Sequence, residues 1–382
     1  MSARYRVIFL ALAAVALVTG VWGGLLRAGW AGLGHRLIAH VVLQHGALMI
    51  SGVLGTVIGL ERAVALGRPW AYAGPALSAA GALAALLKPD GRFPLLALLP
   101  QVLWLAAGAV LVAVYVQEWR AHTRSAGPDA PPPDRMPVLV MGGGAVAWLL
   151  GSGAALFGGL PLGSVHLWVL FLVLTIAGER LELGRLANLA AARRTAFLVV
   201  AGVTALGPLV TLAGGGGPGA RFFGAGLLAL SVWLAFNDVA RYTIRRPGLP
   251  RYVAVCLLSG YVWLAVGGAL LLRYGAVSAG LQYDAALHCV LLGFVFAMIF
   301  GHAPIIIPAV IGLAVPYRVA FYVPLVLLHL GVAARVGADL AGSVVGRQHG
   351  AMTNTATLVL FAATLLYSIR RGPPPAPAVP AT

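Results

Sequence analysis

The sequence carries very little charge. Only 9% of its 382 residues are Asp, Glu, Lys or Arg, and Lys88 is the single lysine, whereas 60% are hydrophobic and the mean hydropathy is +0.94. A soluble domain would need an enormous buried core to carry this composition. The scarcity of charge therefore excludes an ordinary soluble protein. The net charge of +16 does not indicate nucleic acid, because the arginines fall in short gaps between apolar runs, as in the loops of membrane proteins.

Cysteine is also scarce. Cys256 and Cys289 both lie inside apolar runs, and no Cys-x-x-Cys spacing occurs. A disulfide framework and a thiolate metal cluster are therefore excluded. The 50 glycines include clusters at 142–144 and 214–217, but neither cluster stands between a strand and a helix as a phosphate-binding loop would.

Long apolar runs dominate what remains. A transmembrane helix needs about 20 mainly apolar residues to cross ~30 Å of hydrocarbon, and the sequence predicts about twelve such helices in one all-α domain over residues 1–371. The expected helices cover residues 6–26, 37–60, 70–87, 94–116, 137–157, 162–180, 195–213, 222–240, 251–272, 282–303, 317–335 and 351–369.

The connections between these runs predict the topology. Residues 118–136 contain AGPDAPPPDR and are expected to form a solvated cytoplasmic linker, and the Pro/Ala-rich residues 372–382 a disordered tail. Most of the 26 Lys and Arg residues fall on the side that holds both termini. The excess of basic residues on that side predicts that both termini are cytoplasmic. The protein is then a multi-pass protein of a bacterial-type inner (plasma) membrane, and its partner is the membrane lipid.

Histidine gives the clearest functional signal. Two of the nine histidines, His122 and His302, are expected toward the cytoplasmic side. The other seven are expected near the outer face: His35, His40, His45, His166, His288, His329 and His349. Ionisable side chains in a membrane face the bundle interior or a polar cavity, and neutral imidazole is the commonest metal ligand. The alternative for each single histidine is a hydrogen bond to a neighbouring helix.

Three of the outer histidines are evenly spaced. His45, His166 and His288 are separated by 121 and 122 residues, and each interval contains four expected helices. This spacing predicts three pseudo-repeated four-helix units, each with one outer histidine on its second helix.

Polar residues recur at the inner ends of the same three helices. They are Glu61 with Arg62, Glu179 with Arg180, and His302. The carboxylates are candidates for a proton path, since intramembrane carboxylates often serve that role; interfacial ion pairs are the alternative. Asp284, one turn before His288, is expected to orient that imidazole or to cap its helix.

The helix plan and the stretches His45-Gly46-Ala47-Leu48-Met49 and His288 to His302 resemble two related groups of proteins. One is subunit I of the haem-copper oxidases, and the closer one is the NnrS family of twelve-helix membrane proteins associated with haem, copper and nitric oxide stress. The resemblance implies a fold like oxidase subunit I, with b-type haem held by His45 and His288. It also implies that copper could bind at a second site.

The second metal site that the resemblance implies would draw on the remaining outer histidines, His40, His166, His329 and His349. The oxidase copper centre also requires a histidine pair on the seventh helix, and residues 195–213 contain no histidine. Oxygen-reductase chemistry is therefore not expected.

Three functions remain open at this point. The first is a haem-binding, or haem-copper, redox protein in electron transfer or the nitric oxide response, with a respiratory or electron-donor membrane partner. The second is a multi-pass transporter or channel, because twelve helices with weak internal repeats also describe many carriers. The third is an accessory subunit of a respiratory membrane complex. None of the three involves nucleic acid.

Overall fold

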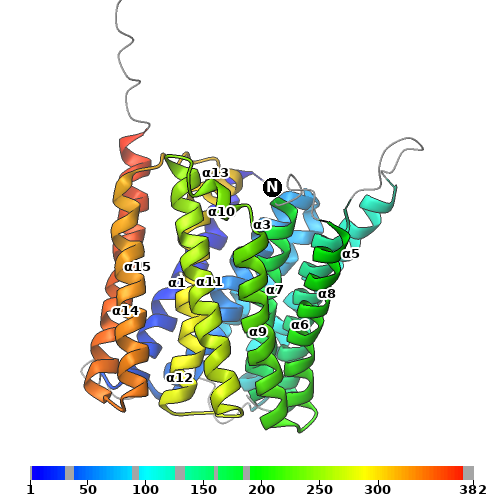
Figure 1. Ribbon diagram of the computed structural model, residues 1–382. Coiled ribbons are helices and arrows are strands. Elements are labelled where there is room, and N and C mark those ends of the chain that lie inside the picture. The colour runs from blue at the N-terminus through cyan, green and yellow to red at the C-terminus, as the bar shows by residue number, and fades with distance from the viewer. Residues whose placement is uncertain are drawn as a thin grey trace, which may run out of the picture.

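The described chain is built from apolar helices (Figure 1). The computed structural model describes residues 2–30, 38–87, 94–124, 134–158, 162–183 and 190–372, without the side chains of 38–41, 94–95 and 123–124. No strand occurs in these ranges. The expectation of an all-α membrane protein is confirmed, because eleven of the described helical stretches are long and apolar enough to cross a membrane.

Nine of the eleven stretches are described by single helices or by a helix with a short 3₁₀ turn at its start. They are α1 (Ala3–Ala28), η3 (Pro94–Leu98) with α5 (Leu99–Arg124), α6 (Met136–Gly158), α7 (Leu162–Leu183), α8 (Ala191–Leu212), α9 (Gly216–Asn237), α11 (Leu249–Tyr274), η6 (Val319–Phe321) with α14 (Tyr322–Leu340), and α15 (Val344–Arg371). The short helix α10 (Ala240–Thr243) links α9 to α11.

The other two spans are interrupted by π-helix. The first runs α2 (Ile38–Ala47), η1 (Leu48–Gly55), α3 (Thr56–Leu66), and the second runs α12 (Leu281–His288), η5 (Cys289–Phe296), α13 (Ala297–Ile311). Eight consecutive π-helical residues in each widen the helix directly after His45 or His288. Such segments are rare and often mark functional sites.

One expected membrane crossing is shorter than the others. Residues 70–87 form only α4 (Ala73–Leu86), about 21 Å long at 1.5 Å per residue, after the 3₁₀ turn η2 (Pro69–Tyr72). Gly67, with φ 68°, ends α3, and regular α-helix resumes only at Ala73. The described bundle therefore has eleven long helices and one short one. The three-unit repeat stays a prediction.

The expected linker at 118–136 is also shorter, because α5 continues to Arg124 and α6 begins at Met136. Residues 118–124 continue helix α5, because they contain neither proline nor glycine. Residues 125–133 and the expected tail from 373 onward lie outside the described residues.

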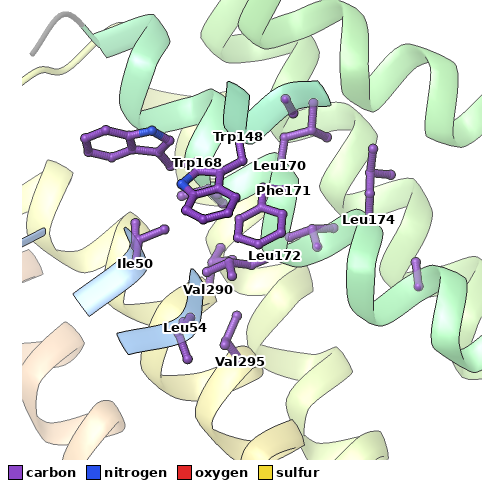
Figure 2. Close-up of a cluster of buried hydrophobic side chains, with 14 of the residues drawn as sticks. Ile50, Leu54, Trp148, Trp168, Leu170, Phe171, Leu172, Leu174, Val290 and Val295 are labelled. Carbon is purple, nitrogen blue, oxygen red and sulfur yellow. The ribbon is translucent and has the colours of Figure 1, made fainter. Parts of the chain in front are cut away.

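Helix α7 is the most buried of the long helices. Its own side chains are apolar on every face, which is typical of a helix at the centre of a bundle. Trp148 of α6 stacks on Phe171 of α7, with ring centroids 5.0 Å apart. Figure 2 shows these rings against Ile50 of η1 and Val290 of η5. The Trp148 indole donates a hydrogen bond of 3.0 Å to Ser51, so its polar atom is satisfied. Both π-helical segments thus pack around the α7 core.

Both described ends of the chain lie on one face of the bundle. In Figure 1 the N-terminus, the end of α15 and the ends of α3 and α13 are at the top, and α12 is at the bottom. Helix α12 contains His288, so this histidine belongs to the half of the bundle opposite the termini. The polar ends of α3 and α13 belong to the half that holds the termini.

Candidate functional site

His45 and His288, the two expected haem ligands, lie next to each other. Their ring centroids are 6.4 Å apart and their planes differ by 16°. One histidine ends α12 and the other lies three residues before η1, so two separate spans bring their imidazoles together inside the bundle.

The His45 imidazole is oriented by a glycine face of α1. Its Nδ1 is 2.6 Å from the Gly20 carbonyl oxygen, and because a carbonyl only accepts, Nδ1 carries the proton. The ring packs on Gly24, where a Cβ atom would stand 2.7 Å from the imidazole Cε1. The Nε2 lone pair of His45 is therefore left available as a metal ligand.

His288 is oriented in the same way by its own helix. Its Nδ1 donates to the Asp284 carbonyl oxygen at 2.8 Å, so its Nε2 also presents a lone pair. The Asp284 carboxylate lies 3.4 Å from the same Nδ1 and accepts two hydrogen bonds from Arg335, at 2.8 and 3.0 Å. Asp284 thus lies against the imidazole and links it to the guanidinium of Arg335 on α14.

Both imidazoles line one cavity. About 70 Å³ of it can be reached by the centre of a water molecule, and its walls are mainly apolar, with Met49, Leu291 and Phe296 among them. Polar atoms come from Arg335 and from Asn354, which is buried and whose amide has no hydrogen-bond partner among the described residues. The cavity therefore combines two nitrogen ligands, a cation and an unsatisfied amide.

The spacing of the rings fits one metal ion. The two rings are nearly parallel, with centroids 6.4 Å apart, and two imidazoles that bind one ion through metal–nitrogen bonds of about 2.0–2.1 Å lie at a similar separation. Hydrogen bonds on Nδ1 are also the usual outer-shell support of metal-bound histidine. The donor set fits an ion held between two Nε2 atoms.

The other outer histidines lie apart. His166 packs against Phe223, His329 accepts a hydrogen bond of 2.9 Å from Trp263, and His349 meets Trp30 edge-on. His40 belongs to α2, with its side chain outside the described part. No three metal-ligating side chains of His, Cys, Asp or Glu cluster within the described ranges, and because the His40 side chain lies outside them, the second metal site stays a prediction.

The polar residues at the inner ends do come together. Arg62 binds Glu61 at 2.7 Å and lies 3.6 Å from Glu179, so one guanidinium bridges α3 and α7. Both carboxylates and His302 line a second cavity, of which about 290 Å³ can be reached by the centre of a water molecule. The two carboxylates share the Arg62 guanidinium, and this cavity is the larger of the two.

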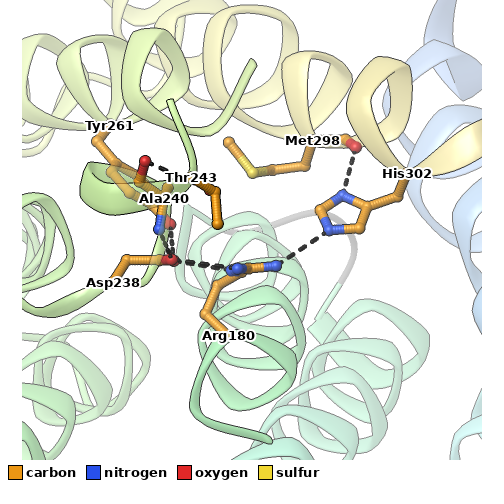
Figure 3. A network of polar contacts seen from close by, with 7 residues as sticks. All are labelled: Arg180, Asp238, Ala240, Thr243, Tyr261, Met298 and His302. Atoms are coloured by element: carbon orange, nitrogen blue, oxygen red, sulfur yellow. Dashed lines mark hydrogen bonds and ion pairs between the residues drawn. The ribbon is translucent and has the colours of Figure 1, made fainter. Parts of the chain in front are cut away.

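Arg180 connects the same region to α11 (Figure 3). It donates to both carboxylate oxygens of Asp238, at 2.7 and 3.1 Å, and Tyr261 donates to the same carboxylate at 2.5 Å. Arg180 also donates to His302 Nε2 at 3.3 Å, while His302 Nδ1 donates to Met298. Each guanidinium nitrogen of Arg180 thus has a hydrogen-bond partner inside the bundle, and the role of this network in a proton path stays a prediction.

Sequence reasoning missed several residues of these two sites. Arg335 and Asp238 each lie inside an apolar run, and an isolated charge in such a run was a usable signal. Met49 gave no separate signal, because methionine is an ordinary core residue.

Comparison with known proteins defines the family. No curated protein and no solved structure matches the chain. A family model, described as a domain of unknown function (DUF8744), matches residues 6–370. Because this match spans nearly the whole chain, the protein belongs to the DUF8744 family.

Proposed function

We propose that this protein is a membrane redox protein that binds haem between His45 and His288 and transfers electrons. The observation that carries the proposal is the pair of neighbouring, nearly parallel imidazoles, with ring centroids 6.4 Å apart and both Nδ1 atoms engaged by carbonyl oxygens. Bound between two imidazoles, haem iron supplies a reversible one-electron couple.

The surrounding residues support an apolar, anionic cofactor. The cavity walls are mainly aliphatic, which suits the face of a macrocycle. Arg335 lines the cavity with its guanidinium held by Asp284 and offers a cation to a carboxylate group. The Asn354 amide, without a partner among the described residues, offers a further donor.

Ligation by both histidines favours electron transfer over reaction with nitric oxide. Haem held by both His45 and His288 would have no coordination position left for a gas. The apolar walls keep water away from both rings, and the carbonyl of Gly20 fixes the orientation of the His45 ring. Exposure of the purified protein to nitric oxide is therefore expected to leave its absorbance spectrum unchanged.

One observation favours a second candidate, a single copper ion. The cavity of about 70 Å³ takes an ion directly, whereas a macrocycle requires its walls to move apart. Met49 lines the same cavity one turn after His45, and two imidazoles with a thioether form a soft donor set that selects Cu(I). The redox role would be the same with either metal.

Metal analysis and a reduced-minus-oxidised spectrum of the full chain, purified from membranes, test the proposal. Haem predicts a Soret band and about one iron per chain, both lost in His45→Ala and His288→Ala. His122→Ala is the matched control, because His122 donates to the Glu118 carbonyl at the far end of α5. It is expected to keep both signals.

The same experiment separates the two metals. Copper without a Soret band, lost in Met49→Leu as well as in the two histidine variants, would identify the copper site. Haem would instead persist in Met49→Leu. A chain that contains neither iron nor copper after expression with both supplied would refute the redox proposal.

A further inference from the structure

The second cavity is a binding site in its own right. It lies between α1, α3, η5 with α13, and α7, and its walls are aliphatic and aromatic except at one end, where Glu61, Glu179 and His302 meet. Large apolar cavities do not hold water well. A volume of about 290 Å³ with one polar end therefore suits an apolar molecule that carries a polar head.

The polar end is rich in acceptors. Arg62 pairs with both Glu61 and Glu179, and the two carboxylate side chains keep 21% and 20% of their accessible surface. His302 already receives a hydrogen bond from Arg180 and donates to Met298. The unused hydrogen-bonding capacity is thus on the carboxylate oxygens and on the buried hydroxyl of Thr175, which has no partner among the described residues. Carboxylate oxygens recognise hydroxyl donors and repel an anionic head such as that of a fatty acid.

The cavity also reaches the outer surface of the bundle. Ala14 of α1 lines the cavity and is at the same time exposed, and α1 packs against α13. Ala14 is therefore the point at which a ligand dissolved in lipid would reach the cavity from the side of the bundle.

The two cavities share a wall. Leu54 of η1 and Phe296 of η5 line both of them, so a ligand in the second cavity is separated from the His45 and His288 site by one layer of side chains. Both shared residues belong to the π-helical segments.

We propose that the second cavity binds a membrane quinol, with its hydroxyl groups donating hydrogen bonds to Glu61 and Glu179 and its tail toward Ala14. Any role of this quinol as an electron donor rests on the proposed function; its binding does not.

Photolabelling with an azido-quinol under anaerobic conditions tests the site, using the full chain in lipid nanodiscs and decylubiquinol as competitor. The label is expected to be saturable, to be displaced by the competitor and to map to α1, α3, α7 or α13 by mass spectrometry. Ala14→Phe closes the entrance and is expected to reduce labelling about tenfold. Val15→Phe is the matched control, because Val15 is exposed beside Ala14 and does not line the cavity.

The outcomes separate this proposal from the one before. His288→Ala is expected to lose the metal and keep the label. A wild-type chain with its metal but without saturable labelling would overturn the quinol site alone. Equal reduction of the labelling by Ala14→Phe and Val15→Phe would show a lipid-filled cavity and would overturn the quinol site. Labelling that is unchanged in Glu61→Gln would overturn it in the same way.

Discussion

Replacing Gly24 by alanine is expected to weaken metal binding although both ligands remain. The new Cβ atom would stand 2.7 Å from His45 Cε1 and 3.0 Å from Nδ1, whereas carbon atoms in contact are about 3.5–4.0 Å apart. The imidazole must therefore move by about 0.8 Å or more. Its bond to Gly20, now 2.6 Å, would lengthen to about 3.4 Å and be lost, since such bonds end near 3.2 Å.

The expected loss follows from this displacement. The hydrogen bond contributes about 0.5–1.5 kcal/mol, and removing such an outer-shell partner typically lowers metal affinity about 10–100-fold. Iron and copper content per chain, together with the absorbance spectrum, measure the effect, and circular dichroism verifies that the variant is folded.

Gly46→Ala is the control for this prediction. Gly46 lies beside His45 on an exposed helix face, where a new Cβ would meet nothing within 4 Å. Alanine there is expected to stabilise the helix by about 0.5–1 kcal/mol and to keep the metal. Full metal content and an unaltered spectrum in Gly24→Ala would refute the assignment of His45 as an oriented ligand.

Three further predictions concern stability and reactivity. Asp238→Asn breaks the ion pair with Arg180, whose side chains are 5% and 0% exposed. Thermal unfolding should therefore show a loss of about 3–5 kcal/mol in unfolding free energy. A smaller loss than in Asp134→Asn would contradict this. Asp134→Asn alters a half-exposed pair and should cost under about 1 kcal/mol. Cys256 and Cys289 are fully buried, so maleimide should label them only after denaturation; rapid native labelling would contradict this burial.

Most of the fold follows from local sequence. An apolar run of about 20 residues in lipid must satisfy its own backbone, and the helix does so; the run at 137–157, for example, became α6, Met136–Gly158. Residues 70–87 were as apolar, but Pro69 and Gly67 changed the backbone at their start, and only Ala73–Leu86 is α-helical. The π-helical segments have ordinary apolar sequences and could not be predicted by hydropathy.

The candidate site was predictable only in part. His45 and His288 were both expected near the outer face, on helices that belong to different repeat units, and the structure places their rings 6.4 Å apart. The pairing of Asp284 with Arg335 joins residues 51 positions apart on α12 and α14. Helical periodicity gives the face of a side chain but not its partner on another helix, so this pair required the three-dimensional packing.

Replacing His166 by leucine is expected to stabilise the chain and to leave its metal content unchanged. His166 is fully buried against Phe223, and neither ring nitrogen has a hydrogen-bond partner among the described residues. A buried unsatisfied polar group costs about 1–3 kcal/mol, and leucine has a similar volume without polar atoms. The unfolding temperature should therefore rise. A loss of copper in His166→Leu would contradict this, because it would make His166 the copper ligand that the oxidase resemblance implies, and its unpaired nitrogens would then be explained by the metal.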